Sequence, residues 1–445
     1  MADLDAVVVG AGLSGLSCAR ALRRAGARVL VLEAQARVGG RTLSERVGEA
    51  TFDLGGQWVG PAQPRALALL REVGATTFRT FDDGDKVLDV RGRTSTYRGT
   101  IPSVAPWKLL ELHRALRTLE RHTARVPMGR GHAMPDADRL DQHTVHAFSE
   151  AHVRSRTVRA LLAAAARVVF GAEVREIGLL WFLHYLRAGG GLLSLTSIQG
   201  GAQELRVVEG TQSMSLGLAR GLDVELGQPV RQIAQDADGV RVVSDVGAYR
   251  ARFAVLAVPP PLVGRIAFDP PLPAERDQLY QRFPMGATVK CLATYGAPFW
   301  RKRGLSGEVV CPDGPATVVF DNTSADGREP ALLAFVVGDH ARTWHLRPAE
   351  LRKREILTAL ARWLGKEALE PRLYLEKNWA EEPFVRGCPT GNLGPGVLSL
   401  VGDGLRAPVG RLHFAGTETA REWTGYLEGA IEAGERAARE IEERL

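Results

Sequence analysis

Residues 6–15 read AVVVGAGLSG, and this stretch decides the fold of the first part of the chain. A continuous apolar run, Ala6 to Val9, leads into a glycine turn, and a helical pattern follows from Leu16 to Ala25. A second apolar strand, Arg28 to Leu32, ends at Glu33. Strand, glycine turn, helix and acidic strand end together form the context of a dinucleotide-binding fingerprint. The sequence therefore predicts a Rossmann-like unit at its N-terminus.

The three glycines of this turn have separate predicted tasks. Gly10 permits the tight turn, Gly12 lets the backbone approach a pyrophosphate, and Gly15 lets the helix pack closely on the strand. The helix N-terminus offers free amides and the positive end of its dipole to the phosphates. Glu33 would accept hydrogen bonds from the adenosine ribose, and a carboxylate there argues against a 2′-phosphate and so against NADP. The fingerprint by itself leaves NAD and FAD open.

The next motif, ARVGGRT at residues 36–42, favours FAD. Gly39 and Gly40 allow a second close approach of the backbone to a ligand. Arg37 and Arg41 offer guanidinium groups that could reach the extended pyrophosphate and ribityl chain of FAD. We therefore expect FAD as the cofactor.

The composition of the 445-residue chain bounds the remaining possibilities. At roughly 100 to 200 residues per domain, the length predicts two or three domains. Hydrophobic residues make up 45% and charged residues 24%, which is typical of a globular protein and excludes global disorder. The four cysteines are far apart and form no CxxC pair, so a disulfide framework and a cysteine zinc site are excluded, and no metal site is predicted.

Charge and hydropathy argue against two further classes of protein. The net charge is only +6 and the basic residues are scattered, so no nucleic-acid-binding surface is expected. The start of the chain, Met1 to Asp5, is acidic where a secretory signal is basic. The most apolar later stretch, Gly178 to Ile198, contains His184 and Arg187 and does not form the run of about 20 apolar residues that a membrane span needs. The sequence therefore predicts a soluble, cytoplasmic protein.

Three further segments extend the argument, and two of them lie near the C-terminus. Residues 53–58 read DLGGQW, and residues 411–419 and 423–430 read RLHFAGTET and WTGYLEGA. The C-terminal pair describes a short strand, a Gly/Thr turn and a helix, whose N-terminus can stabilise negative charge on a reduced flavin. Together with residues 36–42, these motifs resemble the flavin amine oxidase family.

The resemblance covers residues 1–75 and 366–445, which look like the monoamine oxidase branch, whereas the centre matches by isolated motifs. It implies an α/β fold, with a Rossmann-like FAD-binding domain carrying the GxGxxG turn and a second, α+β substrate-binding domain. We expect a discontinuous FAD-binding domain at 1–76, 206–282 and 384–445. The substrate-binding domain is then 77–205 and 283–383.

Lys290 lies in a pattern that alternates as a strand does, GATVKCLATY at residues 286–295. A lysine inside an apolar strand is informative in a chain that uses arginine for most of its positive charge. It matches the family lysine that holds a water against flavin N5 and assists reoxidation by dioxygen. The alternative is a lysine on an edge strand that faces solvent.

Cys388 follows Gly387, in a segment that begins with Asn378 and Trp379. It matches the cysteine that carries the thioether link to the flavin 8α-methyl group in monoamine oxidases, so a covalent link at Cys388 is expected as one outcome. The other outcome is a buried free cysteine that acts as a small hydrophobe, because many bacterial relatives hold FAD without a bond.

Tyr426 matches one wall of the aromatic pair that aligns the amine in front of the flavin. The second wall departs from the family pattern, because Pro389 stands where the second tyrosine would be. The cage is then half open, or Trp379 or another aromatic residue closes it. Gln203 matches a family glutamine of the substrate pocket, with a simple turn residue as the alternative, and Trp58 is expected in the same pocket.

These arguments predict one set of catalytic and binding residues. Lys290, Tyr426 and Trp379 are expected to be catalytic, and the backbone at Val230 is expected to meet the adenine. The predicted cofactor-binding residues are Gly10, Gly12, Ser14, Gly15, Glu33, Ala34, Arg37, Gly39, Gly40, Arg41, Gly55, Gly56, Gln57, Trp58, Val230, Trp379, Cys388, Gly416, Thr417, Glu418, Gly425 and Tyr426.

The resemblance implies an FAD-dependent amine oxidase. A neutral amine would be oxidised to an imine, which hydrolyses to an aldehyde or ketone plus ammonia, while O2 is reduced to H2O2. An L-amino-acid oxidase or a polyamine or diamine oxidase of the same fold remains an alternative, as do a desaturase and a non-catalytic FAD-binding protein. The chain ends at Leu445, directly after the predicted flavin helix, so no C-terminal membrane anchor is expected. A homodimer is common among such enzymes.

Overall fold

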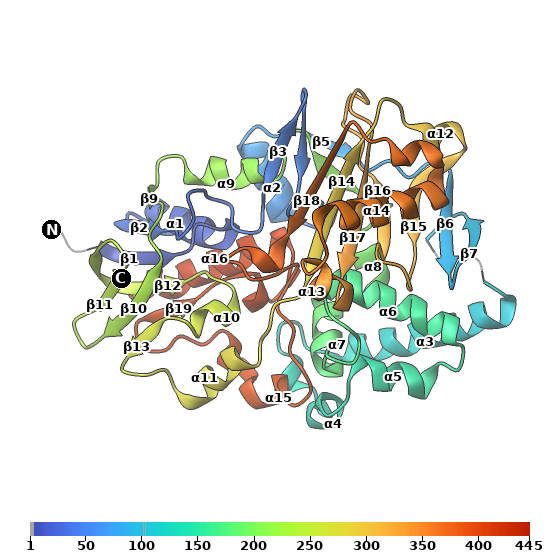
Figure 1. Ribbon diagram of the computed structural model, residues 1–445. Helices are drawn as coiled ribbons and strands as arrows, with labels where there is room; N and C mark the ends of the chain where they lie inside the picture. The colour runs from blue at the N-terminus through green and yellow to red at the C-terminus, as the bar shows by residue number, and fades with distance from the viewer. Residues whose placement is uncertain (1–3, 101, 103) are drawn as a thin grey trace.

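The computed structural model describes residues 4–100, 102 and 104–445. Figure 1 shows two sheets side by side, each with helices packed against it. Blue and red segments, from the two ends of the chain, lie together around the first sheet, which is drawn on the left. Most of the helices between residues 106 and 188 cover the lower right of the molecule.

The first sheet has eight strands in the order β13-β10-β11-β12-β1-β2-β9, and β19 pairs with β12. Strand β1 pairs in parallel with both β2 and β12, as in a Rossmann-like unit. The strands are β1 (Leu4–Val9), β2 (Val29–Leu32), β9 (Asp223–Glu225), β10 (Val230–Gln235), β11 (Val240–Ser244), β12 (Ala248–Leu256), β13 (Ala267–Asp269) and β19 (Leu412–Phe414). The expectation of a Rossmann-like α/β unit is confirmed.

Two helices from opposite ends of the chain pack against each other beside this sheet. Helix α1 (Leu13–Arg24) contacts α16 (Leu427–Glu442) along its length. The approach requires glycine, because a Cβ atom on Gly434 would lie 2.1 Å from the carbonyl oxygen of Ser14. The apolar periodicity predicts a helix start at Leu16, but α1 begins at Leu13. The difference arises because the glycine-containing first turn gives no amphipathic signal. The N-terminus of α1 therefore lies directly at the glycine turn.

The second sheet has seven strands in the order β18-β14-β17-β16-β15-β6-β7. They are β6 (Asp85–Val90), β7 (Arg93–Tyr97), β14 (Thr288–Thr294), β15 (Leu305–Val310), β16 (Val318–Asp321), β17 (Ala331–Val337) and β18 (Leu373–Asn378). Strand β14, which carries Lys290, lies between β17 and β18 and is buried along its whole length. An edge position for this strand is therefore wrong.

The remaining elements connect or cover the two sheets. Two small two-stranded sheets pair β3 (Ser44–Val47) with β4 (Ala50–Asp53) and β5 (Thr77–Arg79) with β8 (Leu205–Val207). The other helices are α2 (Pro64–Glu72), α3 (Pro106–Arg125), α4 (Ala137–Asp141), α5 (Val145–His152), α6 (Arg156–Phe170), α7 (Leu179–Ala188), α8 (Leu192–Thr196), α9 (Gln212–Ala219), α10 (Pro260–Val263), α11 (Ala274–Gln281), α12 (Phe299–Lys302), α13 (Asp339–Trp344), α14 (Ala349–Leu364) and α15 (Leu398–Val401). Short 3-10 helices are η1 (Gly131–Ala133), η2 (Lys366–Leu369), η3 (Trp379–Glu381), η4 (Gly402–Leu405) and η5 (Thr417–Thr419).

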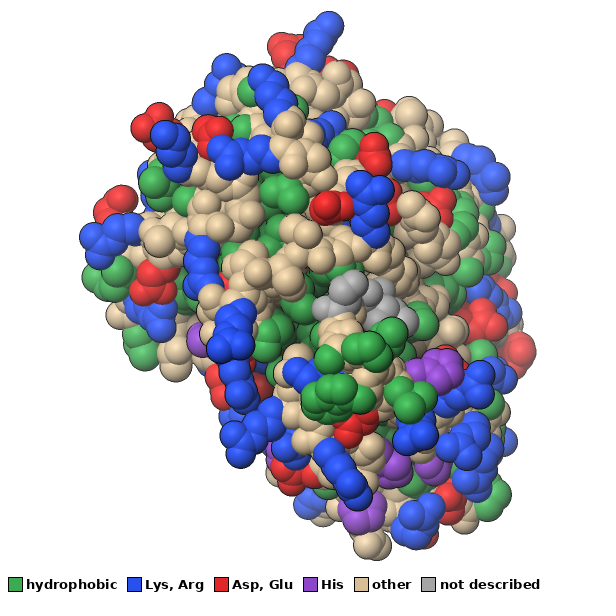
Figure 2. Space-filling view, turned by 90° about the vertical axis from the view of Figure 1, so that its right-hand side faces the viewer, with side chains coloured by type: hydrophobic (Ala, Val, Ile, Leu, Met, Phe, Trp, Pro, Cys, Tyr) green, Lys and Arg blue, Asp and Glu red, His purple; other side chains and the backbone are tan. Residues whose placement is uncertain are grey.

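The surface carries charges of both signs. On the face shown in Figure 2, basic and acidic side chains are interspersed, and hydrophobic side chains gather near the centre. Helix α3 contributes exposed hydrophobic residues, Trp107, Leu109 and Leu110. In residues 4–100, 102 and 104–445, no helix combines the length and the hydropathy needed to cross a bilayer. The same residues contain no group of three or more side chains placed to hold a metal ion.

Candidate functional site

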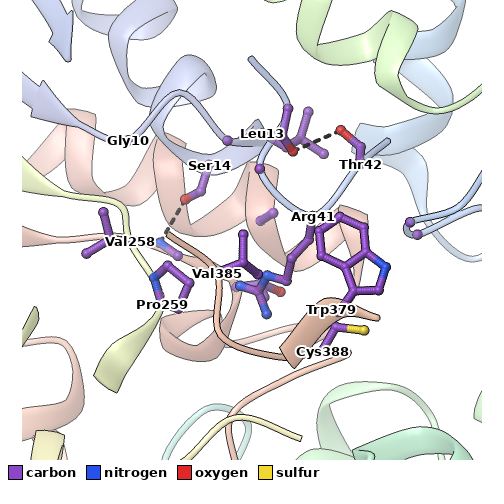
Figure 3. A pocket seen from close by; sticks show the side chains of 18 of the residues that line it. Gly10, Leu13, Ser14, Arg41, Thr42, Val258, Pro259, Trp379, Val385 and Cys388 are labelled. Carbon is purple, nitrogen blue, oxygen red and sulfur yellow. Dashed lines mark hydrogen bonds between the residues drawn. The ribbon is translucent and has the colours of Figure 1, made fainter. Parts of the chain in front are cut away.

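A single cavity brings together the motifs from both ends of the chain. It is lined by residues after β1 and β2, by residues of β14 and β17, and by the segment that precedes α16. Figure 3 shows Gly10 and Ser14 on one side of this cavity and Trp379 and Cys388 on the other. The cavity therefore extends from the glycine turn of the first sheet to the second sheet.

The glycine turn leaves a backbone surface open to a ligand. Gly10 has a φ of +104°, a left-handed conformation that favours glycine, and a Cβ on Gly15 would lie 2.0 Å from the carbonyl oxygen of Gly10. Gly12 differs, because a Cβ added there would meet only the Cα of Gly40, 4.0 Å away. Gly12 also forms a bridge with Gly39. Such an open backbone beside the N-terminus of α1 fits the pyrophosphate of a dinucleotide.

A hydrogen bond joins the N-terminal and C-terminal turns. The backbone N–H of Gly416 donates to Ser14 Oγ at 2.8 Å, one of the dashed lines in Figure 3. Gly416 has a φ of +97°, and a Cβ there would meet nothing closer than 3.7 Å. Beyond this turn, the Thr417 hydroxyl donates to the carbonyl oxygen of Tyr426 at 2.9 Å. The two turns thus form one side of the cavity.

Glu33 follows β2, lines the cavity and is buried. Its carboxylate accepts hydrogen bonds from the N–H groups of Ala11 at 2.7 Å and Gln35 at 2.9 Å. Burial raises the pKa of Glu33 above its ordinary value, and these backbone donors oppose the shift. Ala34 and Val230 line the cavity together with Glu33. Each carboxylate oxygen keeps a lone pair, so Glu33 can still accept a hydrogen bond from a ribose.

The two predicted arginines have structural partners inside the protein. Arg37 does not line the cavity; it donates to the carbonyl oxygens of Thr42 at 3.1 Å and Gly40 at 3.0 Å and so supports the second glycine turn. Arg41 lines the cavity and binds Glu418 at 2.5 and 3.0 Å. Although burial would raise the pKa of Glu418, the charge and hydrogen bonds of Arg41 lower it below its ordinary value.

Arg41 also holds the segment that carries Cys388. It donates to the carbonyl oxygen of Pro389 at 2.8 Å, and the hydroxyl of Thr288 donates to the carbonyl oxygen of Cys388 at 3.1 Å. The Cys388 side chain lies beside Trp379 in Figure 3. Burial raises the pKa of the Cys388 thiol to about 12, although Arg41 and Lys290 lower it. Cys388 is therefore a protonated thiol at neutral pH in this environment.

Lys290 is buried and its three N–H bonds are all used. Its ammonium donates to the carbonyl oxygen of Asp53 at 2.9 Å, to that of Gly55 at 2.7 Å and to Gln57 Oε1 at 2.6 Å. Burial lowers the pKa of Lys290 to about 7, against the opposing charge of Asp53. An ammonium has three donors. A water molecule could therefore bind Lys290 in one of two ways. It could replace one of the three acceptors of the ammonium, or it could donate a hydrogen bond to Lys290 in its neutral amine form.

The aromatic residues occupy two regions of the cavity. The Tyr426 ring lies 6.2 Å from that of Tyr185, and the Tyr426 hydroxyl donates to the Leu195 carbonyl oxygen at 3.4 Å. Trp379 donates to the Leu54 carbonyl oxygen at 2.8 Å. Within the part of the chain that the structure describes, Trp379 forms no ring contact with Tyr426. The aromatic neighbour of Tyr426 in the cavity is therefore Tyr185.

Two lining residues have buried polar atoms without partners among the described residues. These atoms are Trp58 Nε1 and Gln203 Oε1. An unpaired buried donor and acceptor are costly unless a ligand or water meets them. Trp58 also stacks on Phe335, with ring centroids 5.8 Å apart. Gln203 and Trp58 are thus placed to contact a small polar ligand.

Sequence reasoning missed several lining residues and placed others behind the cavity surface. Gly15, Arg37 and Glu418 lie outside the lining, where they support helix packing, the second glycine turn and Arg41. Tyr185 and Phe335 line it but were not predicted. Phe335 pairs with Lys290 across β14 and β17, a register that the sequence pattern does not reveal. No motif surrounds Tyr185, so only the packing of α7 could identify it. The other predicted site residues line the cavity, namely Gly10, Gly12, Ser14, Glu33, Ala34, Gly39, Gly40, Arg41, Gly55, Gly56, Gln57, Trp58, Gln203, Val230, Lys290, Trp379, Cys388, Pro389, Gly416, Thr417, Gly425 and Tyr426.

Comparison with known proteins gives consistent matches over almost the whole chain. The family described as flavin containing amine oxidoreductase matches residues 13–442. A probable flavin-containing monoamine oxidase A of Dictyostelium discoideum is 40% identical over 446 residues, which cover 99% of this chain and 98% of that protein. A putative flavin-containing monoamine oxidase of Mycobacterium tuberculosis is 40% identical over 441 residues, covering 98% of this chain and 96% of the relative.

Solved structures agree with these sequence matches. Putrescine oxidase with bound putrescine superposes with a TM-score of 0.95 at 33% identity, and 99% of each chain is covered. Cyclohexylamine oxidase from Brevibacterium oxydans superposes with a TM-score of 0.95 at 32% identity, again over 99% of this chain.

Proposed function

The chain belongs to the flavin containing amine oxidoreductase family, and from this premise we propose that it oxidises a neutral primary amine with FAD held in the described cavity. The observation that carries the proposal is the hydrogen bond between Ser14 and Gly416, which joins the N-terminal and C-terminal glycine turns. Both turns line the same cavity as Lys290 and Tyr426. The products are an imine, hydrolysed to an aldehyde or ketone plus ammonia, and H2O2 formed from O2.

The open backbone of Gly12 and Gly416 would hold the phosphates and the flavin, and Glu33 with Val230 would hold the adenosine. When bound, FAD supplies the two-electron acceptor for the amine and the means of reducing O2. The protein orients the amine and excludes water around it. We propose that Lys290 acts beside the flavin, where its pKa of about 7 lets it hold either an ammonium or a neutral amine near neutral pH.

The lining near Tyr426 supports binding of an amine without a charge. Of the described lining residues, the one carboxylate is Glu33, which belongs to the adenosine end. An ammonium entering beside Tyr426, Tyr185 and Leu195 would lose its hydration without gaining a counterion. We therefore expect kcat/KM to rise with pH toward the pKa of the substrate amine, and a constant kcat/KM between pH 7 and 10 would contradict this reasoning.

An amino-acid substrate needs a guanidinium group to bind its carboxylate. The arginines that line this cavity either bind a carboxylate of the protein or lie away from Tyr426 and Lys290. Arg41 is bound to Glu418, and Arg231 binds Asp245 at the surface. Arg265 lies after α10, near Val258 and Ile266. These positions favour an amine over an amino acid as substrate.

A peroxide-release screen tests the proposed function. The purified holoenzyme is offered primary monoamines, diamines, polyamines and L-amino acids at equal concentration. We expect the highest kcat/KM with primary monoamines. Turnover of amino acids alone would refute the proposal, and turnover confined to diamines would move the protein to a different substrate class.

Covalent attachment of the flavin at Cys388 is a separate proposal. Its support is the position of the thiol in the lining beside Trp379 and near the charges of Arg41 and Lys290. After denaturation in acid or urea, we expect the polypeptide to stay yellow and to carry the mass of FAD. The Cys388→Ala variant should release its flavin under the same conditions. Colourless wild-type polypeptide of unmodified mass would refute the link.

We also propose the division of the chain into an FAD-binding domain at 1–76, 206–282 and 384–445 and a substrate-binding domain at 77–205 and 283–383. The pairing of β12 with both β1 and β19 supports it, because these strands come from the middle, the beginning and the end of the chain. A homodimer belongs to the same proposal, and sedimentation of the holoenzyme at micromolar concentration tests it.

A further inference from the structure

A second cavity, separate from the one described above, is rich in arginine. It is lined by Arg130, Arg406, Arg421 and Arg436, with Asp403 and Glu440 as the acidic members. None of these residues lines the first cavity. The second cavity measures about 590 Å³, which leaves room for a small hydrated ion.

The acidic residues of this cavity are already bound to other cations. Asp403 binds Arg130 at 3.1 Å, and its other oxygen lies 3.4 Å from His132 Nε2. Glu440 binds Arg436 at 2.5 Å and His413 Nδ1 at 2.9 Å. Neither carboxylate forms an ion pair with Arg406 or Arg421 within the described residues.

Arg406 is a buried cation that is bound to carbonyl groups. Its guanidinium donates to the carbonyl oxygens of Thr419 at 2.6 Å, Gly129 at 2.5 Å and Ala420 at 3.0 Å. A guanidinium has five N–H bonds, so two remain for another acceptor. Burial, and after it the charge of Arg436, lower the pKa of Arg406 to about 10, although Glu432 opposes them. A buried charge without a counterion is costly.

Arg436 also lines this cavity and carries a buried donor without a partner among the described residues. Its side chain is 5% exposed, and its Nε is buried and has no hydrogen-bond partner within the described residues. The two other nitrogens donate to Glu440, to the carbonyl oxygen of Phe414 at 2.7 Å and to the Thr419 hydroxyl at 2.9 Å. Nearby, the backbone N–H of Arg421 donates to Glu432 at 3.1 Å. Arg421 is an exposed residue that lines the cavity.

We propose that this arginine-lined cavity binds a small oxyanion with the geometry of phosphate. Guanidinium groups present forked N–H pairs that match the oxygens of phosphate and bind them more strongly than neutral donors do. The lining has four guanidinium groups and two carboxylates, those of Asp403 and Glu440. Even with the charge of Glu432, which acts on Arg406, the cavity keeps an excess of positive charge. A bound oxyanion would give Arg406 a direct ion-pair partner, which it does not have among the described residues.

The site is connected to the cavity of the proposed active site through one turn. Arg406 and Arg436 both bind Thr419, the last residue of η5, and Gly416 and Thr417 of the same turn line the first cavity. An anion that neutralises Arg406 therefore stabilises the turn that binds Ser14. We expect phosphate to raise the Tm of the holoenzyme more than chloride at equal ionic strength.

Isothermal titration of the holoenzyme with inorganic phosphate tests the proposal, in an oxyanion-free buffer whose ionic strength is held constant with sodium chloride. We expect one site per chain with a Kd on the order of 1 mM or below. Arg421→Gln should weaken binding about tenfold, because it removes one charge-assisted contact, and Arg421→Glu should abolish it. Arg354→Gln, which changes an exposed arginine of α14 outside the cavity, is the matched control.

A parallel titration with AMP distinguishes the source of the oxyanion. Binding of inorganic phosphate alone supports a free phosphate ligand, whereas tighter binding of AMP, also weakened by Arg421→Gln, supports a phosphate monoester. Absence of saturable binding of both probes to the wild-type protein would overturn the proposal. Equal affinities in the Arg421→Gln and Arg354→Gln variants would overturn it as well.

Discussion

The pH dependence of stability at Lys290 offers a quantitative test of its buried position. Burial lowers the pKa of Lys290 from 10.5 to about 7 in the folded protein. The unfolded chain thus binds more protons than the folded chain between pH 7 and 10.5, so the free energy of unfolding rises with pH in that range. Below pH 7, the buried Lys290 ammonium lowers the free energy of unfolding by its full amount. This destabilisation diminishes as the pH rises toward 10.5.

The structure sets the size of this effect. At about 1.36 kcal/mol per pKa unit, the Lys290 contribution to the free energy of unfolding changes by about 2.5 kcal/mol between pH 7.5 and 9.5. With an unfolding entropy of about 2.1 cal/mol/K per residue, that difference corresponds to about 3 °C in the Tm of this chain. The Lys290→Met variant lacks the titrating group, so its Tm should not show this rise of about 3 °C between pH 7.5 and 9.5.

The assay compares the Tm of wild type and Lys290→Met by differential scanning calorimetry across this pH range. Other groups titrate in both proteins, so their effects cancel when the difference in Tm is plotted against pH. Lys302→Met, which changes an exposed lysine of α12, serves as the control and should track the wild type. A difference between wild type and Lys290→Met that stays constant within 1 °C, or that changes in the opposite direction, would refute a low pKa for Lys290.

Three further substitutions test the cavity. Glu418→Gln removes the buried carboxylate that pairs with half-buried Arg41, so the free energy of unfolding should fall by about 3 kcal/mol, seen as a Tm lower by several degrees. Ser14→Ala leaves the buried N–H of Gly416 without its acceptor, which should cost about 1 to 3 kcal/mol; unchanged FAD retention and Tm would contradict the role of this bond. Gly12→Ala should fold normally, because Gly12 has a φ of −73° and open space for a Cβ, yet bind FAD more weakly in a fluorescence titration. Wild-type FAD affinity in Gly12→Ala would mean that the cofactor does not approach this backbone.

The glycine turn shows why much of the fold could be predicted. The left-handed conformation of Gly10 and the close packing at Gly15 depend on neighbours within a short stretch, so the residue pattern itself carries the information. Strand β2 was predicted within one residue for the same reason, since it is a short apolar run between turns. The open backbone at Gly12 likewise follows from the motif.

The partners of charged residues depend on distant parts of the chain. Arg41 lines the cavity, as the motif predicts, and it also binds Glu418, 377 residues away, because a buried carboxylate needs a cation at close range. Alternation predicted a strand around Lys290, yet only its pairing with β17 and β18 makes that strand central and the lysine buried. No local feature of the sequence reports which strands will flank another.

The glycine turn at residues 10–15 and the family could be identified from the sequence alone, because they follow from backbone conformations and motifs that need few neighbours. Only the tertiary structure decided that Tyr185 is the cavity neighbour of Tyr426, that Lys290 has three buried acceptors, and that four arginines converge on a second cavity. Those contacts join buried charges and aromatic rings from segments that are far apart in the sequence. They therefore depend on the packing of the whole molecule.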